Sequence, residues 1–298
     1  MEYNTLGKSN IKISEIGFGC MSLKNIESEN INIIHSAIDQ GINYFDTADM
    51  YDKGDNEILV GKAVKEKRKE IILATKVGNQ WRADVTGWDW NPTKEYILKE
   101  IDNSLQRLQT DYIDLYQLHG GTLEDNIDET IEAFEILKEK GKILEYGISS
   151  IRPNVIREYV QKSHIVSVMM QYSLLDRRPE EAMLGLLKEN NISVLSRGTL
   201  ASGLLVDKPA KAYLDHTEKG IKDFQNLIHK QTNGKDTATA VAISFVLSAP
   251  ALASAAIGIR TQAQLDSILH AYSIRNEFKQ LAKELADHLY PLKYSQHR

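Results

Sequence analysis

The sequence is poor in the residues that mark secreted, metal-binding and disulfide-bonded proteins. It has one cysteine in 298 residues, so no internal disulfide can form and a reducing compartment is the simplest expectation. The first ten residues, MEYNTLGKSN, contain no apolar signal core, and we therefore expect a cytoplasmic protein. No two histidines are spaced two or four residues apart, which argues against a metal-dependent hydrolase and leads us to expect no metal.

Charge and hydropathy exclude two further kinds of partner. The 36 lysines and arginines are interspersed with 41 aspartates and glutamates, for a net charge of −5, and no basic stripe indicates nucleic-acid binding. Residues 237–259 carry no charge, a length that could span a bilayer. This stretch is rich in Ala, Ser and Thr, however, and Pro250 interrupts it. We therefore predict a buried helix, Ala238–Ser248, and a buried strand, Ser254–Ile257, with no membrane partner.

Short apolar runs alternate with helix-like segments along the chain. Strand followed by helix, repeated eight times, is the pattern of a (β/α)8 TIM barrel, here as one domain of residues 1–298. The predicted strands are Glu15–Gly19, Asn43–Asp46, Ile71–Lys76, Ile113–His119, Ile143–Ile148, Val166–Gln171, Ser193–Ser196 and Ser254–Ile257. The predicted helices are one capped by Ser28 and ended by Gly41, then Asn56–Glu66, Thr93–Leu108, Ile127–Glu139, Pro153–Gln161, Pro179–Asn190, Thr237–Ser248 and Gln262–Ala271.

Three segments fall outside this alternation. Tyr3–Ile13 predicts an N-terminal β-hairpin that turns at residues 7–10. Thr199–Lys235 is too long for an ordinary connection, and such loops usually carry function and some structure of their own. Asn276–Leu289 predicts an additional C-terminal helix.

Four side chains of complementary chemistry stand at the ends of predicted strands or just after them. Asp46, Lys76 and His119 end three strands, and Tyr51 lies in the loop after Asp46. The strand ends of a barrel converge on one face, so we expect these side chains to meet there. A carboxylate, an ammonium, an imidazole and a phenol at one point predict proton transfer.

The residue types indicate how the proton would move. Tyrosine is a poor proton donor near neutral pH because the pKa of a phenol is about 10, so it needs a neighbour that favours the phenolate. Lys76 would be that neighbour, and Asp46 would keep the buried lysine charged and oriented. His119 would donate a hydrogen bond to a substrate carbonyl oxygen. Together they would protonate an oxygen while another group delivers a hydride to its carbon.

Seven ordered motifs resemble the aldo-keto reductase family over essentially the whole chain. They are GINYFDTADMY at Gly41–Tyr51, NExLxG at Asn56–Gly61, TK at Thr75–Lys76, YQLH at Tyr116–His119, GISS at Gly147–Ser150, QYSLL at Gln171–Leu175 and GIRTxxQL at Gly258–Leu265. The resemblance implies a barrel that binds NADP(H), with NADPH preferred over NADH, and reduces a small aldehyde or ketone. It implies that Tyr51 is the general acid and that Lys76 and Asp46 tune it. His119 would orient the carbonyl.

The resemblance also implies a cofactor site. The residues concerned are Gly19, Cys20 and Met21 after the first strand, Ser149, Ser150 and Gln171 at the nicotinamide amide, Arg197 at the end of the seventh strand, Leu200, Gly203 and Leu204 along the pyrophosphate, and Gly258, Arg260 and Gln264 at the 2′-phosphate. Arg260 would supply a bidentate phosphate donor. Ser267 and Ile268 stand where members often carry glutamate and asparagine against the adenine, which leaves the choice between NADPH and NADH to be tested.

All three tryptophans of the chain, Trp81, Trp88 and Trp90, fall in the loop after Lys76. Aromatic side chains on a loop above a catalytic face are suited to line a substrate pocket, and we expect them to do so. They would replace the aromatic residue that family members commonly have at the position of Gly120. The alternative is that they anchor a long loop on the rim of the barrel.

Other interpretations stay open at the level of sequence. A Schiff-base aldolase would use Lys76 as its nucleophile, although Asp46 and Tyr51 would then lack a role. The run GFGCMS at Gly17–Ser22 imitates a dinucleotide fingerprint but lacks its third glycine. A protein with the same fold could also bind NADP(H) as a sensor or regulatory subunit without turnover. Cys20 is not expected to be a nucleophile, because no residue is assigned as its base.

Overall fold

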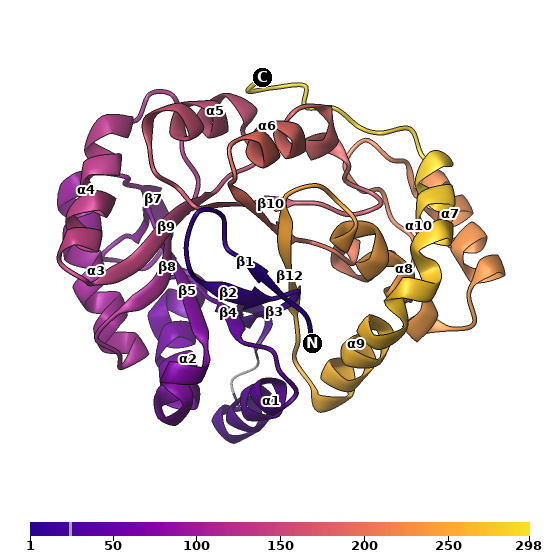
Figure 1. Cartoon of the computed structure of the whole chain (residues 1–298), viewed down its shortest axis with the longest axis horizontal. Helices are drawn as coiled ribbons and strands as arrows, with labels where there is room; N and C mark the ends of the chain where they lie inside the picture. The colour runs from indigo at the N-terminus through magenta and orange to yellow at the C-terminus, as the bar shows by residue number, and fades with distance from the viewer. Residues whose placement is uncertain (24–25) are drawn as a thin grey trace.

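The computed structural model describes residues 1–23 and 26–298, and its centre is a closed barrel of eight strands (Figure 1). The strands are β3 (Ile16–Gly19), β4 (Tyr44–Asp46), β5 (Ile72–Val77), β8 (Ile113–Leu118), β9 (Ile143–Ser149), β10 (Ser167–Gln171), β11 (Ser193–Arg197) and β12 (Leu252–Gly258). Each strand pairs in parallel with the next in this order, and β12 pairs with β3 to close the ring. The prediction of a (β/α)8 barrel is confirmed.

Helices follow the strands and surround the barrel (Figure 1). They are α1 (Glu27–Asp39), α2 (Asp55–Val64), α3 (Lys94–Leu108), α4 (Ile127–Glu139), α5 (Pro153–Lys162), α6 (Met183–Glu189), α8 (Lys235–Leu247) and α9 (Gln262–Ile274). Helix α3 shows why such segments are helical: it buries Ile97, Ile101, Ser104 and Leu108, three or four residues apart, and its N-cap Thr93 accepts a hydrogen bond from the backbone N–H of Tyr96. The other face of α3 is left to solvent.

Helix α1 begins two residues earlier than a cap at Ser28 predicts. It starts at Glu27, so Ser28 lies inside the first turn, and the cap position is taken by Ile26 without a side-chain hydrogen bond. The prediction that Ser28 caps the helix is therefore wrong. Carboxylates in a first turn are stabilised by the positive end of the helix dipole, which favours a start that includes Glu27.

The helix predicted at residues 179–190 is divided in two. A 3₁₀ turn, η4 (Arg178–Glu181), precedes α6, and Ala182 between them leaves helical geometry with φ −156° and ψ −30°. Pro179 stands in the first turn of η4, where its missing N–H costs no hydrogen bond. The proline thus marks the start of the short turn and not of the longer helix.

The predicted N-terminal hairpin closes one end of the barrel. Its strands β1 (Tyr3–Thr5) and β2 (Lys12–Ser14) pair antiparallel. Leu6 and Ile13 are fully buried and pack against interior side chains of the barrel such as Tyr44 and Leu115. The backbone N–H of Gly7 donates to Ser193 Oγ at the start of β11, so the hairpin covers the end where the strands begin. The ends where the strands finish are left for a functional site.

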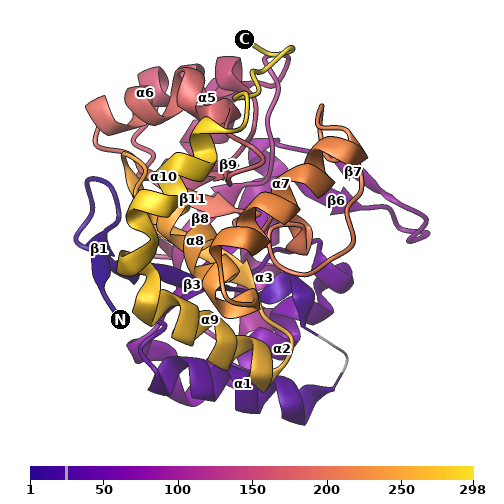
Figure 2. The ribbon, with the colours of Figure 1, turned by 90° about the vertical axis from the view of Figure 1, so that its right-hand side faces the viewer.

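A second hairpin lies in the loop after β5. Strands β6 (Asn79–Trp81) and β7 (Trp88–Trp90) pair antiparallel, with Trp81 opposite Trp88. Figure 2 shows it on the opposite side of the molecule from β1. Sequence reasoning did not find it because each strand has only three residues, too few for a period-two pattern to stand out.

The long segment after β11 has the internal structure that was expected of it. It contains α7 (Glu218–Gln231), which packs with α8 and with the additional C-terminal helix α10 (Lys279–Asp287). Ile221 of α7, Val241 of α8 and Leu285 of α10 share this buried cluster. The uncharged stretch folds as α8 and β12, as predicted. Within residues 1–23 and 26–298, no helix has the length and apolar character to cross a membrane.

Candidate active site

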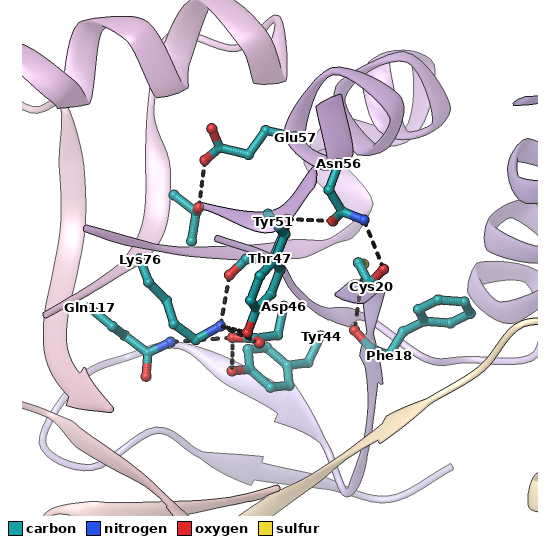
Figure 3. A network of polar contacts seen from close by, with 11 residues as sticks. Phe18, Cys20, Tyr44, Asp46, Thr47, Tyr51, Asn56, Glu57, Lys76 and Gln117 are labelled. Atoms are coloured by element: carbon teal, nitrogen blue, oxygen red, sulfur yellow. Dashed lines mark hydrogen bonds and ion pairs between the residues drawn. The ribbon is translucent and has the colours of Figure 1, made fainter. Parts of the chain in front are cut away.

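The four side chains singled out from the sequence lie at the C-terminal end of the barrel, on or beside neighbouring strands. Asp46 ends β4, Lys76 is next to last in β5, and His119 follows β8 directly. Tyr51 opens a 3₁₀ turn, η2 (Tyr51–Gly54), after β4. Because β5 pairs with both β4 and β8, these strand ends are adjacent. Figure 3 shows the ammonium of Lys76 close to both Asp46 and the phenol of Tyr51.

Lys76 has a partner for each of its three ammonium protons. Its Nζ donates to Asp46 Oδ1 at 2.6 Å and to the carbonyl oxygen of Thr47 at 2.7 Å, and it makes a longer contact of 3.5 Å with the hydroxyl of Tyr51. The lysine is 1% exposed and the aspartate 5%. The two short bonds therefore hold a buried cation in place and aim its remaining proton at the phenol.

The lysine is charged. Burial by itself lowers the pKa of Lys76, but the Asp46 carboxylate and Tyr51 outweigh burial, so the net shift of this pKa is upward. A Schiff-base aldolase needs a free amine at this position. The ion pair with Asp46 works against that chemistry and favours electrostatic support of the phenolate.

Two further side chains donate hydrogen bonds to the Asp46 carboxylate, and neither was predicted from the sequence. Tyr44 donates its hydroxyl to Asp46 Oδ2 at 3.4 Å, and Gln117 Nε2 donates to the same oxygen at 3.3 Å. Burial and Asp46 raise the pKa of Tyr44, so it stays a protonated donor. A signal was available: Tyr44 precedes Asp46 by two residues and shares its face, and Gln117 is a polar residue in an apolar strand, in register with Lys76.

Further hydrogen bonds tie the catalytic loop to α2 (Figure 3). Thr47 Oγ1 donates to Asn56 Oδ1 at 2.7 Å, and Asn56 Nδ2 donates to the carbonyl oxygen of Cys20 at 3.0 Å. On the next strand, Thr75 Oγ1 donates to Glu57 Oε1 at 2.5 Å. Asn56 and Glu57 therefore have a structural role: their hydrogen bonds hold the backbone from which Asp46 and Tyr51 project.

His119 stands edge-on to the phenol. The ring centroids of His119 and Tyr51 are 5.9 Å apart with an interplanar angle of 84°. Burial, together with the cations Lys76 and Arg197, lowers the pKa of His119 to about 3. Its Nδ1 is buried and has no hydrogen-bond partner among the described residues. The imidazole is therefore neutral near pH 7 and can donate one hydrogen bond to a substrate oxygen.

A neutral, buried His119 should make the protein less stable in mild acid. Its pKa is about 3 in the folded chain and about 6.5 in an unfolded one, so between these values the unfolded chain binds the extra proton. The contribution of this group to stability is complete above about pH 6.5 and is lost as the pH falls towards 3. We expect His119→Asn to flatten the decline of the unfolding free energy between about pH 6.5 and 4.5, measured by urea titration. Equal slopes for the two proteins would contradict a depressed pKa.

The residues predicted to hold a cofactor occupy the other strand ends of the ring. Ser149, Gln171, Arg197, Gly258 and Gly19 end β9, β10, β11, β12 and β3 in turn. These five strands are consecutive around the barrel, and β4, β5 and β8 complete it. One face of the barrel therefore carries the catalytic candidates on one part of its rim and the cofactor candidates on the rest. Their contact with a cofactor stays a prediction.

Several of the cofactor candidates have buried side chains. The thiol of Cys20 is fully buried against the carbonyl oxygen of Phe18, and burial and Asp46 raise its pKa, so it is an unreactive thiol. Leu204 is 1% exposed within the cluster of α7, α8 and α10. Any contact of these two residues with a ligand would have to come from the backbone. Met21, in contrast, is 63% exposed.

The N-terminus of α9 carries three of the residues considered for the cofactor phosphate, Gly258, Arg260 and Gln264, at or just before its first turn. Thr261 caps the helix by accepting a hydrogen bond from the backbone N–H of Gln264 at 3.2 Å, and Gln264 Oε1 accepts from the backbone N–H of Arg260 at 2.9 Å. The carboxamide oxygen of Gln264 is thus used to cap the helix. The guanidinium of Arg260 is exposed and forms no hydrogen bond or ion pair with a described residue. A free guanidinium beside a helix N-terminus fits a phosphate.

Trp90 anchors the second hairpin on the barrel rim. Its Nε1 donates to Asp125 Oδ1 at 2.9 Å. Its ring covers Gly78 and Gly120, and a Cβ built on Gly120 would lie 3.1 Å from that ring. The close approach, together with a φ of +143° at Gly120, explains why this position has no side chain. This arrangement is the anchoring alternative; a role of Trp90 in the substrate pocket stays untested.

Trp81 and Trp88 differ in exposure. Trp81 is half-buried, and its Nε1 donates to the carbonyl oxygen of Met50 at 3.1 Å, directly before Tyr51. Trp88 is 46% exposed. Trp81 is therefore attached to the loop that carries the phenol, while Trp88 lies on the surface of the hairpin. Substrate contacts of both residues stay predictions.

Comparison with known proteins agrees with this geometry. Residues 15–286 match the family described as the Aldo/keto reductase family. The chain is 48% identical to the uncharacterized oxidoreductase YqkF of Bacillus subtilis (strain 168), with 100% of both chains covered, and 32% identical to the NADH-specific methylglyoxal reductase of Escherichia coli (strain K12), with 70% of each covered. It superposes with a TM-score of 0.92 on the aldo-keto reductase AKR11C1 from Bacillus halodurans in its holo form, at 46% identity over 100% of this chain and 99% of that one. This chain therefore belongs to the aldo/keto reductase family of oxidoreductases.

Proposed function

We propose that the protein reduces a small aldehyde or ketone to an alcohol with NADPH as the hydride source. The observation that carries the proposal is the buried ammonium of Lys76, held by Asp46 and directed at the hydroxyl of Tyr51. A phenol in that position loses its proton at a smaller energetic cost, because the phenolate forms next to a fixed positive charge.

Each side chain of the site has a role in this reaction. Tyr51 donates its proton to the carbonyl oxygen, and Lys76 stabilises the phenolate that is left. Asp46 keeps the lysine protonated and in place. Neutral His119 donates a hydrogen bond that orients the carbonyl. A bound dihydronicotinamide would supply the hydride to the carbonyl carbon.

This arrangement also supports turnover over a role as a sensor. A protein that only binds NADP(H) has no need of a buried ion pair directed at a phenol, and breaking such a pair would cost stability. We therefore expect activity with a panel of small aldehydes and ketones, followed by the loss of dihydronicotinamide absorbance. Binding of NADPH without reduction of any carbonyl in the panel would instead favour the sensor.

We propose NADPH over NADH because Arg260 is free to bind a 2′-phosphate. The name of the relative from Escherichia coli specifies NADH, so membership of the family does not decide the preference. Arg260→Met should weaken NADPH binding by about 10-fold to 100-fold, the value of a charged hydrogen bond, and leave NADH binding unchanged. Titration calorimetry would measure both affinities. Arg157→Met, on an exposed position of α5, is the control, and an equal loss for both cofactors would refute the assignment of Arg260.

A further inference from the structure

A polar cavity of about 440 Å³ lies next to the catalytic loop but is lined by none of the four catalytic candidates. Its wall combines the loop before Tyr51, the β6–β7 hairpin and helix α3. A volume of a few hundred Å³ is the size of a small-molecule site. The cavity is therefore a candidate for a second ligand site.

The buried part of this cavity is acidic. Of its lining residues, Asp49, Asn79 and Glu100 are buried. Glu100 is satisfied, because it accepts hydrogen bonds from Arg107 at 2.5 Å and from Asn103 at 2.8 Å. The Asp49 carboxylate is 5% exposed, and neither of its oxygens has a hydrogen-bond partner among the described residues.

An unpartnered buried carboxylate is unusual because its desolvation is not compensated. Burial, with Glu57 and Glu100 nearby, raises the pKa of Asp49, while the backbone amide of Met50 and Arg107 act in the other direction. Burial and the Asp49 carboxylate raise the pKa of the Tyr96 phenol, so this phenol stays protonated beside Asp49. A cationic group brought into the cavity would supply the missing donors.

The outer part of the cavity has the opposite character. Lys53 and Lys99 line it, are exposed, and form no ion pair with a described residue. Glu95 is the exposed carboxylate of the same lining. Two half-buried aromatic rings, Trp81 and Tyr96, belong to the same lining, and the ammonium of Lys53 is 5.6 Å from the ring centroid of Trp81. A bare cation would meet repulsion at the rim, whereas a ligand with an outer carboxylate would not.

We propose that this cavity binds a small zwitterion of the amino-acid class. Its ammonium group would lie at Asp49, where three N–H donors meet the two unpartnered oxygens. Its carboxylate would face Lys53 and Lys99. The short apolar chain between the two charged groups would lie along Trp81 and Tyr96.

The site adjoins the catalytic candidates through hydrogen bonds of its floor. Asn79 Nδ2 donates to the carbonyl oxygen of His119 at 3.1 Å, and the backbone N–H of Asp49 donates to the carbonyl oxygen of Lys76 at 3.3 Å. Binding of a zwitterion to this cavity can nevertheless be measured without any carbonyl reduction. A failure of the proposed reductase activity would therefore not affect this test.

The experiment is titration calorimetry of the full chain with ω-amino acids from glycine to 6-aminohexanoate, each compared with the amine and the carboxylic acid of the same chain length. We expect at least one amino acid to bind at a single site. Asp49→Asn should weaken the affinity for that amino acid at least about tenfold, because a charged hydrogen bond is lost. Asp55→Asn, an exposed carboxylate at the start of α2, is the matched control.

A second variant tests the same proposal even if Asp49→Asn does not fold. Lys53→Met with Lys99→Met changes exposed positions only. It should weaken binding of the amino acid but not of the parent amine, because the two lysines attract a carboxylate and repel a bare cation. Lys65→Met with Lys69→Met is its control. The proposal is overturned if no member of the series binds at about 10 mM, if Asp49→Asn binds as the wild type does, or if the lysine pair has no effect on the amino acid.

Discussion

Replacing Tyr51 by phenylalanine should lower kcat for carbonyl reduction by about 10²-fold to 10⁴-fold, the usual contribution of a positioned general acid. The ring, and with it the edge-on contact with His119, would remain. The loss should appear in kcat, because only the proton donor is removed. Steady-state assays with NADPH and the best substrate of the panel would measure it.

The affinity for NADPH shows whether a lower kcat comes from the missing proton donor or from weaker cofactor binding. It should be nearly unchanged in the Tyr51→Phe variant, as measured by titration calorimetry. Tyr290→Phe, at an exposed position near the C-terminus, is a matched control and should behave as the wild type. A variant that keeps its kcat would remove Tyr51 from the role of proton donor.

Replacing Lys76 by methionine should lower the unfolding free energy by about 3–5 kcal/mol and abolish reduction. The change leaves the Asp46 carboxylate buried with only the longer hydrogen bonds from Tyr44 and Gln117. Desolvation of that charge would then be poorly compensated. Urea unfolding would measure the free energy and the NADPH assay the activity.

A double variant separates lost charge from lost packing. Asp46→Asn combined with Lys76→Met removes both charges and should recover much of the stability but none of the activity. The exposed pair Lys62 and Glu27, whose side chains are 42% and 56% exposed, offers a comparison. Lys62→Met should cost less than about 1 kcal/mol. A similarly small loss for Lys76→Met would contradict the view that the buried pair is structural as well as catalytic.

Much of the fold was predictable because its signals are local. Each barrel strand is a short apolar run, and each helix carries its own periodicity, so their alternation is readable without knowing any contact. Boundaries were less certain where local signals compete. Ser28 suits a cap, yet the acidic residue before it suits a first turn, and the helix includes both.

The catalytic candidates could be located from the sequence because strand ends in a barrel share one face. Apart from the contacts of Lys76 with Asp46 and Tyr51, the interactions that give these side chains their properties could not be predicted. Gln117 reaches Asp46 across 71 positions of the chain, and the neutral state of His119 follows from burial and from Arg197 on a distant strand. Such effects depend on what surrounds a group in space.

The order of strands and helices, the N-terminal hairpin and the gathering of the four candidate side chains at one end of the barrel followed from the sequence, since these depend on residue type, spacing and the common polarity of barrel strands. Tertiary structure alone decided the neutral state of His119, the close approach of Trp90 to Gly120 and the cavity at Asp49. The reason is that burial and Coulomb interactions act between groups that only folding brings within a few ångströms of one another.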